Sequence, residues 1–263
     1  MSETRTFIAL GDLEGVRKRS DVLREEAGHH LCPGCGEGIV IRAIADVIEQ
    51  MGVREQCVLI RGNGCYGGAS MILNIDSAWS LHGRAPAMAS GLRRVHPEPI
   101  IFTLQGDGDL FGEGVLEAVQ AAARGERITI VCVNNGLNAE TGSQMTPASI
   151  PGQRTNTTVD GRDVEQHGHT LQMAELLAGV AGSIFVARGS VHSPVEVKRT
   201  MGYLRTAFAS QRSGGFSYVE ILTMCPSGWH MDPVQALDYQ RDEMAKYHPL
   251  GVVKGKVIAS TVG

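Results

Sequence analysis

The chain alternates between amphipathic stretches and short runs of apolar residues. Apolar residues recur at helical spacing from Glu37 to Met51, which predicts a helix. Apolar runs that begin at Cys57 or fill 100–104 and 128–133 predict strands buried on both faces. A helical pattern over 113–125 separates the last two of these strands. Further helices are predicted near 171–180, 194–208 and 233–247, and further strands at 183–187 and 218–222.

Strands that alternate with helices in this way predict an α/β fold with a doubly wound, mainly parallel sheet. The 263 residues suffice for one large domain with a covered core. We expect an N-terminal lead-in over 1–30, the domain over 31–247 and a C-terminal tail over 248–263. The segment 138–162 shows no periodicity, and a loop of that length in a compact domain is more often functional than idle.

The composition excludes several classes of protein. The net charge is −4 and no basic run stands out, which argues against nucleic-acid binding. No apolar run is long enough to span a membrane, and residues 1–30 mix both charge signs, unlike a signal peptide. We therefore expect a cytoplasmic protein, whose six cysteines are reduced thiols or metal ligands.

The stretch GDGDLFGEG, which begins at Gly106, places two carboxylates in a glycine-rich turn directly after a predicted strand. The glycine spacing does not fit a dinucleotide-binding turn, and a phosphate-binding P-loop would need Gly-Lys-Ser/Thr. A ligand-free turn between strand and helix is the plain alternative. Glycine-rich turns after a strand usually bind phosphate groups, which a carboxylate would repel. If the ligand is a diphosphate, a bridging Mg²⁺ would explain the carboxylate beside it.

Three oxygen ligands for such an ion follow from the predicted strand ends. Asp107 ends one strand, and Asn135 follows the next strand, 28 positions further along. Ligands of open α/β sheets gather where strands end, so we expect the side chains of Asp107 and Asn135 and the carbonyl of Leu137 to share Mg²⁺.

This pairing of a GDG turn with Asn134-Asn135 resembles the motif that binds thiamine diphosphate. Gly106 and Gly108 would let the backbone approach the diphosphate, with Asp107 and Asp109 in the same turn. The resemblance implies thiamine diphosphate and Mg²⁺ as cofactors.

The cysteines divide into two groups. Cys57 and Cys132 lie in predicted strands and are expected to be buried as small hydrophobes. The other four lie in loops or glycine-rich turns: Cys32, Cys35, Cys65 and Cys225. Four thiolates suit zinc or a [4Fe–4S] cluster equally well by spacing, and a redox-active Cys-Pro-Gly-Cys pair is a third option.

Taken together, these motifs resemble the beta subunit of the 2-oxoacid:ferredoxin oxidoreductases over residues 29–240. The resemblance implies that Cys32, Cys35, Cys65 and Cys225 hold one [4Fe–4S] cluster. It gives His82 a catalytic role in handling protons or phosphate. It also implies further cofactor contacts at Asn63, Gly64, Cys65, Tyr66, Leu81, His82, Gly83, Arg84, Ala139, Glu140 and Thr141.

The family implies oxidative decarboxylation of a 2-oxoacid to an acyl-CoA, with electrons passing singly through the cluster to ferredoxin. It also implies an alpha-type subunit with the pyrimidine-binding domain, a gamma-type subunit, and a ferredoxin-like subunit or ferredoxin. The CPSGWHMDPVQAL segment leans toward branched-chain or aryl 2-oxoacids. The alternatives are a non-redox thiamine decarboxylase or synthase with a zinc or vacant cysteine site, and a non-enzymatic module stapled by zinc.

Overall fold

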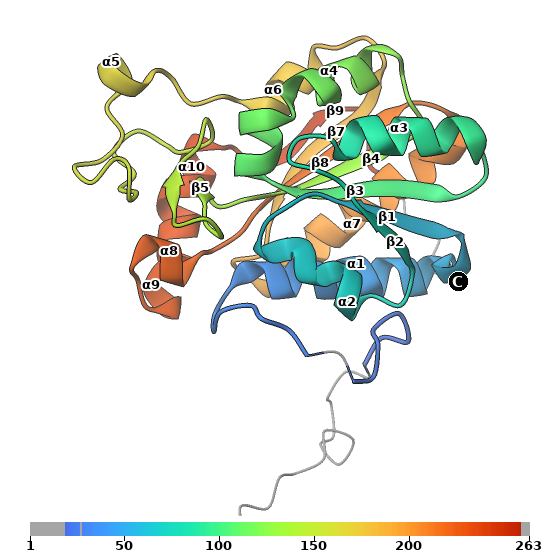
Figure 1. The fold of residues 1–263 in the computed structure, drawn as a ribbon, viewed down its shortest axis with the longest axis horizontal. Helices are drawn as coiled ribbons and strands as arrows, with labels where there is room; N and C mark the ends of the chain where they lie inside the picture. The colour runs from blue at the N-terminus through green and yellow to red at the C-terminus, as the bar shows by residue number, and fades with distance from the viewer. Residues whose placement is uncertain (1–18, 27, 259–263) are drawn as a thin grey trace, which may run out of the picture.

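A computed structural model describes residues 19–26 and 28–258 of the chain. Its centre is a seven-stranded sheet with the order β2-β1-β3-β4-β8-β7-β9 (Figure 1). All neighbouring strands run parallel except the edge strand β9, which is antiparallel to β7. The strands are β1 (Cys57–Arg61), β2 (Asp76–Trp79), β3 (Ile100–Gly106), β4 (Thr129–Asn134), β7 (Ser183–Ser190), β8 (Phe216–Leu222) and β9 (Gly251–Lys254).

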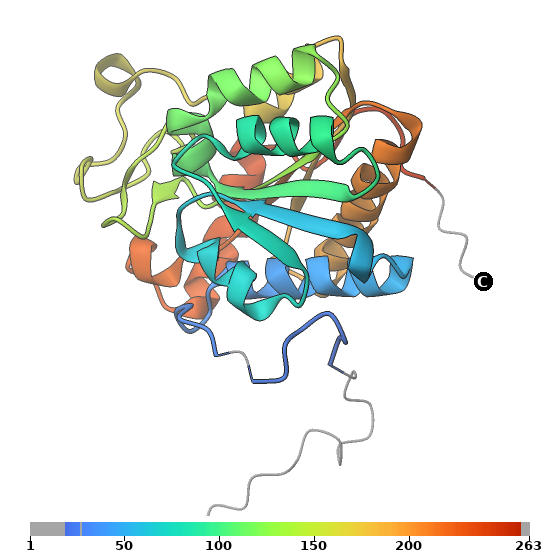
Figure 2. The ribbon, with the colours of Figure 1, turned by 45° about the vertical axis from the view of Figure 1, so that its right-hand side comes forward.

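Helices cover both faces of this sheet (Figure 2). One face carries α1 (Gly36–Met51) and α7 (Pro194–Ser213), and the other carries α3 (Ala85–Val95), α4 (Val115–Ala123) and α6 (Met173–Ala178). The predicted doubly wound, mainly parallel sheet is confirmed. The shorter elements are η2 (Arg54–Gln56), η3 (Cys65–Gly68), α2 (Ala69–Ile72), η4 (Gly108–Glu113), β5 (Leu137–Asn138), β6 (Gln144–Met145), α5 (Val164–His167), α8 (Pro226–Trp229), α9 (Pro233–Tyr239), η5 (Gln240–Met244) and α10 (Ala245–Tyr247).

Two apolar cores explain why the strands are continuous apolar runs. Successive strand residues point to opposite faces, so Phe102 and Val131 pack in the core with α1 and α7. Ile101 and Ile130 pack in the core with α3, α4 and α6. Because both faces are covered, a polar side chain in the middle of the sheet has no access to water and is costly unless it has a buried partner.

The ends of the central strands bring the predicted motifs together. β3, β4 and β8 are neighbours in the sheet and parallel to one another. The turn after Gly106, the Asn134-Asn135 pair and the loop after Leu222 therefore lie side by side at the carboxyl ends of these strands. Strand register pairs Gly106 with Val133 and Asn134 with Leu222. The hairpin strand β5 and the helices α8 and α9 lie at this same end of the molecule (Figure 1).

Some elements differ from the pattern-based expectation. β2, α3 and β9 were not predicted, and β9 lies within the expected C-terminal tail, where it pairs with β7. Within the expected lead-in, Val22 is buried and Leu23 forms a bridge with Leu73, while residues 1–18 lie outside the described part. Among the described residues, none of the helices combines the length and apolarity needed to cross a membrane.

Candidate cofactor site

A small pocket opens among the loops that follow β1, β3 and β4. Twelve of the fourteen residues that line it were predicted as cofactor or metal contacts, whereas Glu37 and Asn138 were not. The lining consists of Glu37, Asn63, Gly64, Cys65, Tyr66, Gly106, Asp107, Gly108, Asp109, Asn135, Leu137, Asn138, Ala139 and Glu140.

Asp107 is a buried carboxylate that has no basic partner in the part of the chain that the structure describes. Its side chain accepts hydrogen bonds from the Thr146 hydroxyl at 2.6 Å and from the Asn135 backbone N–H at 3.2 Å. None of the ion pairs among the described residues joins Asp107 to a Lys or Arg. Burial raises the pKa of Asp107 to about 7, against the opposing effect of its hydrogen bonds. A divalent cation would stabilise the ionised carboxylate here, so Asp107 fits the predicted Mg²⁺.

The turn after β4 presents the other two predicted oxygen ligands beside Asp107. The Asn135 side-chain oxygen accepts a hydrogen bond from the Leu137 backbone N–H at 3.0 Å. An amide oxygen has two lone pairs, so this bond leaves one available for a cation. Leu137 also lines the pocket. This donor set of carboxylate, amide and carbonyl oxygens is the kind that Mg²⁺ prefers.

Glycines keep the floor of the pocket open to a ligand. A Cβ on Gly106 would lie 2.9 Å from the Tyr66 ring, and one on Gly108 would lie 2.6 Å from the side-chain oxygen of Asn138. Gly64 has φ 156°, and a side chain there would collide with the same tyrosine ring. A side chain at any of these positions would displace Tyr66 or Asn138, so this part of the pocket lining requires glycine.

The second carboxylate of the turn has a different task. Asp109 accepts hydrogen bonds from the Gly83 backbone N–H at 2.6 Å, the Tyr66 hydroxyl at 2.9 Å and the Gln105 amide at 3.1 Å. The Nδ1 atom of His82 lies 3.2 Å from the same carboxylate. Asp109 thus ties the His82 segment and Tyr66 to the turn after β3, whereas Asp107 serves the pocket.

Several predicted residues lie outside the lining of the pocket. Leu81 is 79% exposed, and Arg84 pairs with Glu117 on α4. Thr141 bonds to the Gln144 side chain at 2.8 Å. His82 and Gly83 reach the pocket only through Asp109. Their cofactor contacts stay predictions.

Glu37 was missed because it sits in the first turn of α1, where an acidic residue usually faces solvent. The structure buries it instead, and its Oε2 atom has no hydrogen-bond partner within residues 19–26 and 28–258. Burial, with the Asp107 and Glu140 carboxylates adding to it, raises the pKa of Glu37 to about 8. A buried, unpartnered carboxyl group that lines the pocket is suited to contact a ligand. Only its position two residues after Cys35 hinted at this.

The four loop cysteines come together beside the pocket. Cys32 and Cys35 occupy one turn before α1, joined by a backbone bond of 3.1 Å from the Cys35 N–H to the Cys32 carbonyl. The Gly36 N–H bonds to the Met224 carbonyl at 3.0 Å, which brings this turn to Cys225. Charge interactions link Cys65 with Cys32, Cys35 and Cys225, and Cys225 with Cys32 and Cys35.

The backbone N–H groups of Glu37 and Gly228 act to lower the pKa values of Cys35 and Cys225, respectively. Burial raises the pKa of Cys35 and Cys65 to about 12 and that of Cys225 to about 11, and the Glu37 carboxylate adds to each rise. Thiolates at these positions would therefore need a positively charged group. In the described part of the chain, no three His, Cys, Asp or Glu side chains are close enough to enclose a single metal ion. A tetrahedral zinc site would hold its sulfurs about 3.8 Å apart, whereas a four-iron cluster holds its cysteines further apart.

Cys57 and Cys132 are buried in β1 and β4, as predicted.

Comparison with known proteins decides the family. Residues 58–221 match the family described as "Thiamine pyrophosphate enzyme, C-terminal TPP binding domain". The 2-oxoglutarate synthase subunit KorB of Archaeoglobus fulgidus is 30% identical over 215 residues, which are 82% of this chain and 76% of that protein. The chain belongs to the thiamine-pyrophosphate-binding subunits of the 2-oxoacid oxidoreductases.

Other members of this family differ in length. Ketoisovalerate oxidoreductase subunit VorA of Methanothermobacter thermautotrophicus is 35% identical over 222 residues. The match covers 84% of this chain and 46% of that relative, so the chain spans about half the length of VorA. The 2-oxoglutarate:ferredoxin oxidoreductase of Magnetococcus marinus, solved with 2-oxoglutarate, coenzyme A and succinyl-CoA, has the same fold. The TM-score is 0.74 at 22% identity, over 97% of this chain and 90% of that one.

Proposed function

We propose that the chain is the thiamine-diphosphate-binding subunit of an enzyme that oxidatively decarboxylates a 2-oxoacid. The reaction joins the acyl group to coenzyme A, releases CO₂ and yields two electrons. The observation that carries the proposal is the buried Asp107 carboxylate, which lines the pocket next to Asn135 and has no basic partner among the described residues. Thiamine diphosphate, when bound, supplies the carbon nucleophile and the electron sink that decarboxylation requires.

The protein's own residues would bind and orient this cofactor. Asp107, Asn135 and the Leu137 carbonyl would hold Mg²⁺, and the ion would neutralise the diphosphate. Gly106 and Gly108 would admit the diphosphate to the backbone. Asp109 orients the His82 ring through Nδ1, and His82 is our candidate for moving a proton near the reacting carbon.

The four loop cysteines would hold a [4Fe–4S] cluster. Cys65 is both a pocket residue and a member of the cysteine group, so the cluster would lie next to the cofactor. Short separation suits an acceptor of single electrons. We propose a cluster over zinc because Zn²⁺ has no redox chemistry and could not accept the electrons that the reaction yields. A non-redox thiamine enzyme with zinc or vacant cysteines is not favoured, since the relatives are named as oxidoreductases or 2-oxoacid synthases.

Further subunits would complete the active site. Trp79 and Leu81 are 64% and 79% exposed, and the Trp79 indole donates to the side chain of the pocket residue Asn63 at 2.6 Å. An alpha-type subunit carrying the pyrimidine-binding domain would cover these apolar side chains. A gamma-type subunit and a ferredoxin-like subunit or ferredoxin would serve coenzyme A and electron exit. A cytoplasmic location suits six cysteines that form no disulfide.

Anaerobic co-expression with the neighbouring subunits tests the proposal. The purified complex is supplied with coenzyme A, a viologen dye and a panel of pyruvate, 2-oxoglutarate, branched-chain and aryl 2-oxoacids. We expect dye reduction that depends on both coenzyme A and a 2-oxoacid, with the branched-chain or aryl substrates fastest. Decarboxylation without dye reduction would instead support the non-redox alternative.

A further inference from the structure

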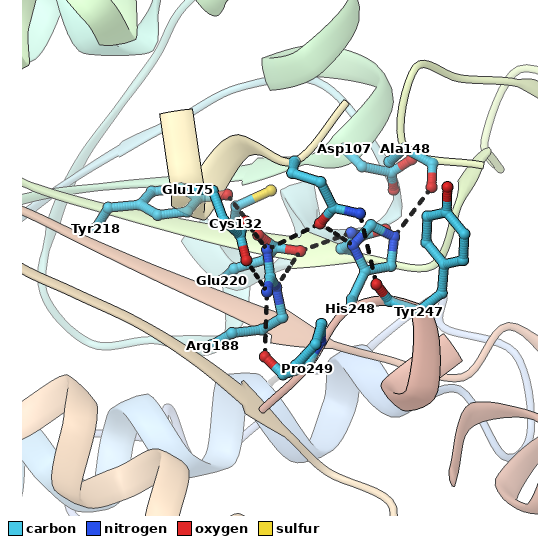
Figure 3. Close-up of polar contacts among 12 residues, drawn as sticks. Asp107, Cys132, Ala148, Glu175, Arg188, Tyr218, Glu220, Tyr247, His248 and Pro249 are labelled. Atoms are coloured by element: carbon cyan, nitrogen blue, oxygen red, sulfur yellow. Dashed lines mark hydrogen bonds and ion pairs between the residues drawn. The ribbon is translucent and has the colours of Figure 1, made fainter. Parts of the chain in front are cut away.

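Figure 3 shows a network of charged and polar side chains around Arg188 and Glu220, and the side chain of Asn134 bonds to Glu220. At its centre, Arg188 on β7 and Glu220 on β8 are partners in the sheet register. Both are fully buried, and the Arg188 Nε atom lies 3.1 Å from the Glu220 carboxylate. Arg188 also donates to both carboxylate oxygens of Glu175, at 2.9 and 2.7 Å, and to the Pro249 carbonyl at 3.1 Å.

Glu220 connects this network to the turn through Asn134. The Asn134 Nδ2 atom donates to the Glu220 carboxylate at 2.8 Å. Its Oδ1 atom accepts the Gly136 backbone N–H at 3.0 Å, an arrangement that shapes the turn. Asn135 lies between Asn134 and Gly136 in the chain, and its backbone N–H donates to the Asp107 carboxylate. The orientation of the Asn134 side chain therefore bears on where the Asn135 side chain points.

Stability alone explains this arrangement poorly. Taking two charges out of water costs free energy, and apolar side chains of similar size often stabilise a core as well as a buried ion pair does. Arg188 already has Glu175 and the Pro249 carbonyl as partners. What Glu220 adds is a charged acceptor for Asn134, at the end of β4 where the cofactor site begins.

A second hydrogen-bonded path reaches the same site. His248 contacts the Ala148 carbonyl at 3.2 Å, and the Ala148 N–H donates to the Thr146 hydroxyl at 3.1 Å. That hydroxyl donates to Asp107. Asp107 and the Asn134–Asn135 turn are thus both hydrogen-bonded to the region around Glu220 and His248, Asp107 through Thr146 and Ala148 and the turn through Asn134.

We propose that Glu220 is a positioning residue for the magnesium and diphosphate site, acting through Asn134 on the turn that carries Asn135. The proposal rests on the proposed function above. Residues that orient metal ligands from behind typically change metal affinity by about 10–100-fold when removed.

The test compares binding in the anaerobically co-purified complex. Calorimetric titrations measure the affinity for MgCl₂ at saturating thiamine diphosphate, and for thiamine diphosphate at saturating MgCl₂. Glu220→Leu removes the acceptor, Glu220→Gln restores a neutral oxygen, and Asn134→Ala removes the donor while leaving the ion pair of Arg188 and Glu220 intact. We expect Mg²⁺ affinity to fall about tenfold or more in Glu220→Leu and Asn134→Ala, less in Glu220→Gln. The double variant Glu220→Leu/Asn134→Ala should bind no more weakly than the weaker single variant.

Gln211 provides the matched control. This buried side chain bonds to Ile101 and Thr129, at the opposite ends of β3 and β4 from the pocket. Gln211→Leu should lower the melting temperature and leave both affinities within about twofold of wild type. Equal loss of Mg²⁺ affinity in this control, or wild-type affinity in Asn134→Ala, overturns the proposal. A wild-type complex that binds no thiamine diphosphate overturns the proposed function instead.

Discussion

At the scale of single residues, the two aspartates of the GDGD turn have separate tasks. Asp107 lines the pocket and has no basic partner among the described residues, whereas Asp109 holds Gly83, Tyr66 and the His82 ring. We propose that one turn can carry two carboxylates because Asp107 would bind a cation, whereas Asp109 accepts several hydrogen bonds.

Replacing Asp107 should separate the two cofactors. We expect Asp107→Ala to lose thiamine diphosphate, because the diphosphate would lose its bridging ion, while iron is retained. Thiamine and iron assays on the purified complex measure both. The control is Asp160→Ala, an exposed aspartate in the long loop, which should keep both cofactors. Retention of thiamine in Asp107→Ala would contradict the assignment.

His248 should make stability depend on pH. Burial lowers the pKa of His248 below its usual value, with Arg188 adding to the effect and Glu220, Glu175 and the Ala148 carbonyl opposing it. Below about pH 6.5 the unfolded chain therefore gains a proton that the folded chain does not, and stability falls as pH decreases. Thermal unfolding at pH 7.5 and 5.5 should show a smaller loss of melting temperature in His248→Gln than in wild type. Equal losses would contradict this.

At the scale of elements, the sequence predicts those helices and strands whose packing imposes a regular pattern of apolar residues. β3, β4 and β8 are buried on both faces, so they appear as continuous apolar runs. β2 and β9 lie at the edges of the sheet and are partly exposed, so their four residues carry no such pattern. α3 buries mostly small residues such as Ala85 and Ala89, and it therefore lacks a strong apolar stripe.

Site residues that belong to a sequence motif could be predicted. Residues that reach the site only through tertiary contacts could not. The GDG and Asn-Asn motifs together with the family resemblance predict most of the residues that line the pocket, because strand order brings the strand ends together. Glu37 could not be predicted, since its burial depends on loops distant in sequence. Glu220 did leave a signal: a charged residue in the middle of an apolar strand requires a buried partner, and Arg188 on β7 is the matching one.

The loop between β8 and α8 provides a test of the cysteine group. Cys225 immediately precedes α8, and the backbone N–H of Gly228 acts to lower the pKa of its thiol. We expect Cys225→Ala to lose most of the iron, because a four-iron cluster needs its fourth thiolate. Anaerobic iron and sulfide assays, with Cys57→Ala as the control in a buried strand, measure this. Unchanged iron in Cys225→Ala would remove Cys225 from the ligand set.

At the scale of the whole molecule, the exposed apolar side chains of Trp79 and Leu81 suit contact with a partner subunit. We expect Leu81→Asp to prevent co-purification of the alpha-type subunit, because a charge would be buried at the interface. Val95→Asp changes an equally exposed residue at the end of α3 and should leave assembly intact. Affinity pull-down of the tagged chain followed by turnover measurements tests this. Normal assembly of Leu81→Asp would place the partner elsewhere.

The central claim is that a magnesium–diphosphate site on Asp107 and Asn135 lies beside an iron–sulfur cluster on four cysteines. The most direct measurement is the cofactor content of the complex purified without oxygen. We expect one thiamine diphosphate and about four iron atoms per copy of this chain, after the iron of any ferredoxin-like subunit is subtracted. A complex free of both thiamine and iron in this chain would contradict it.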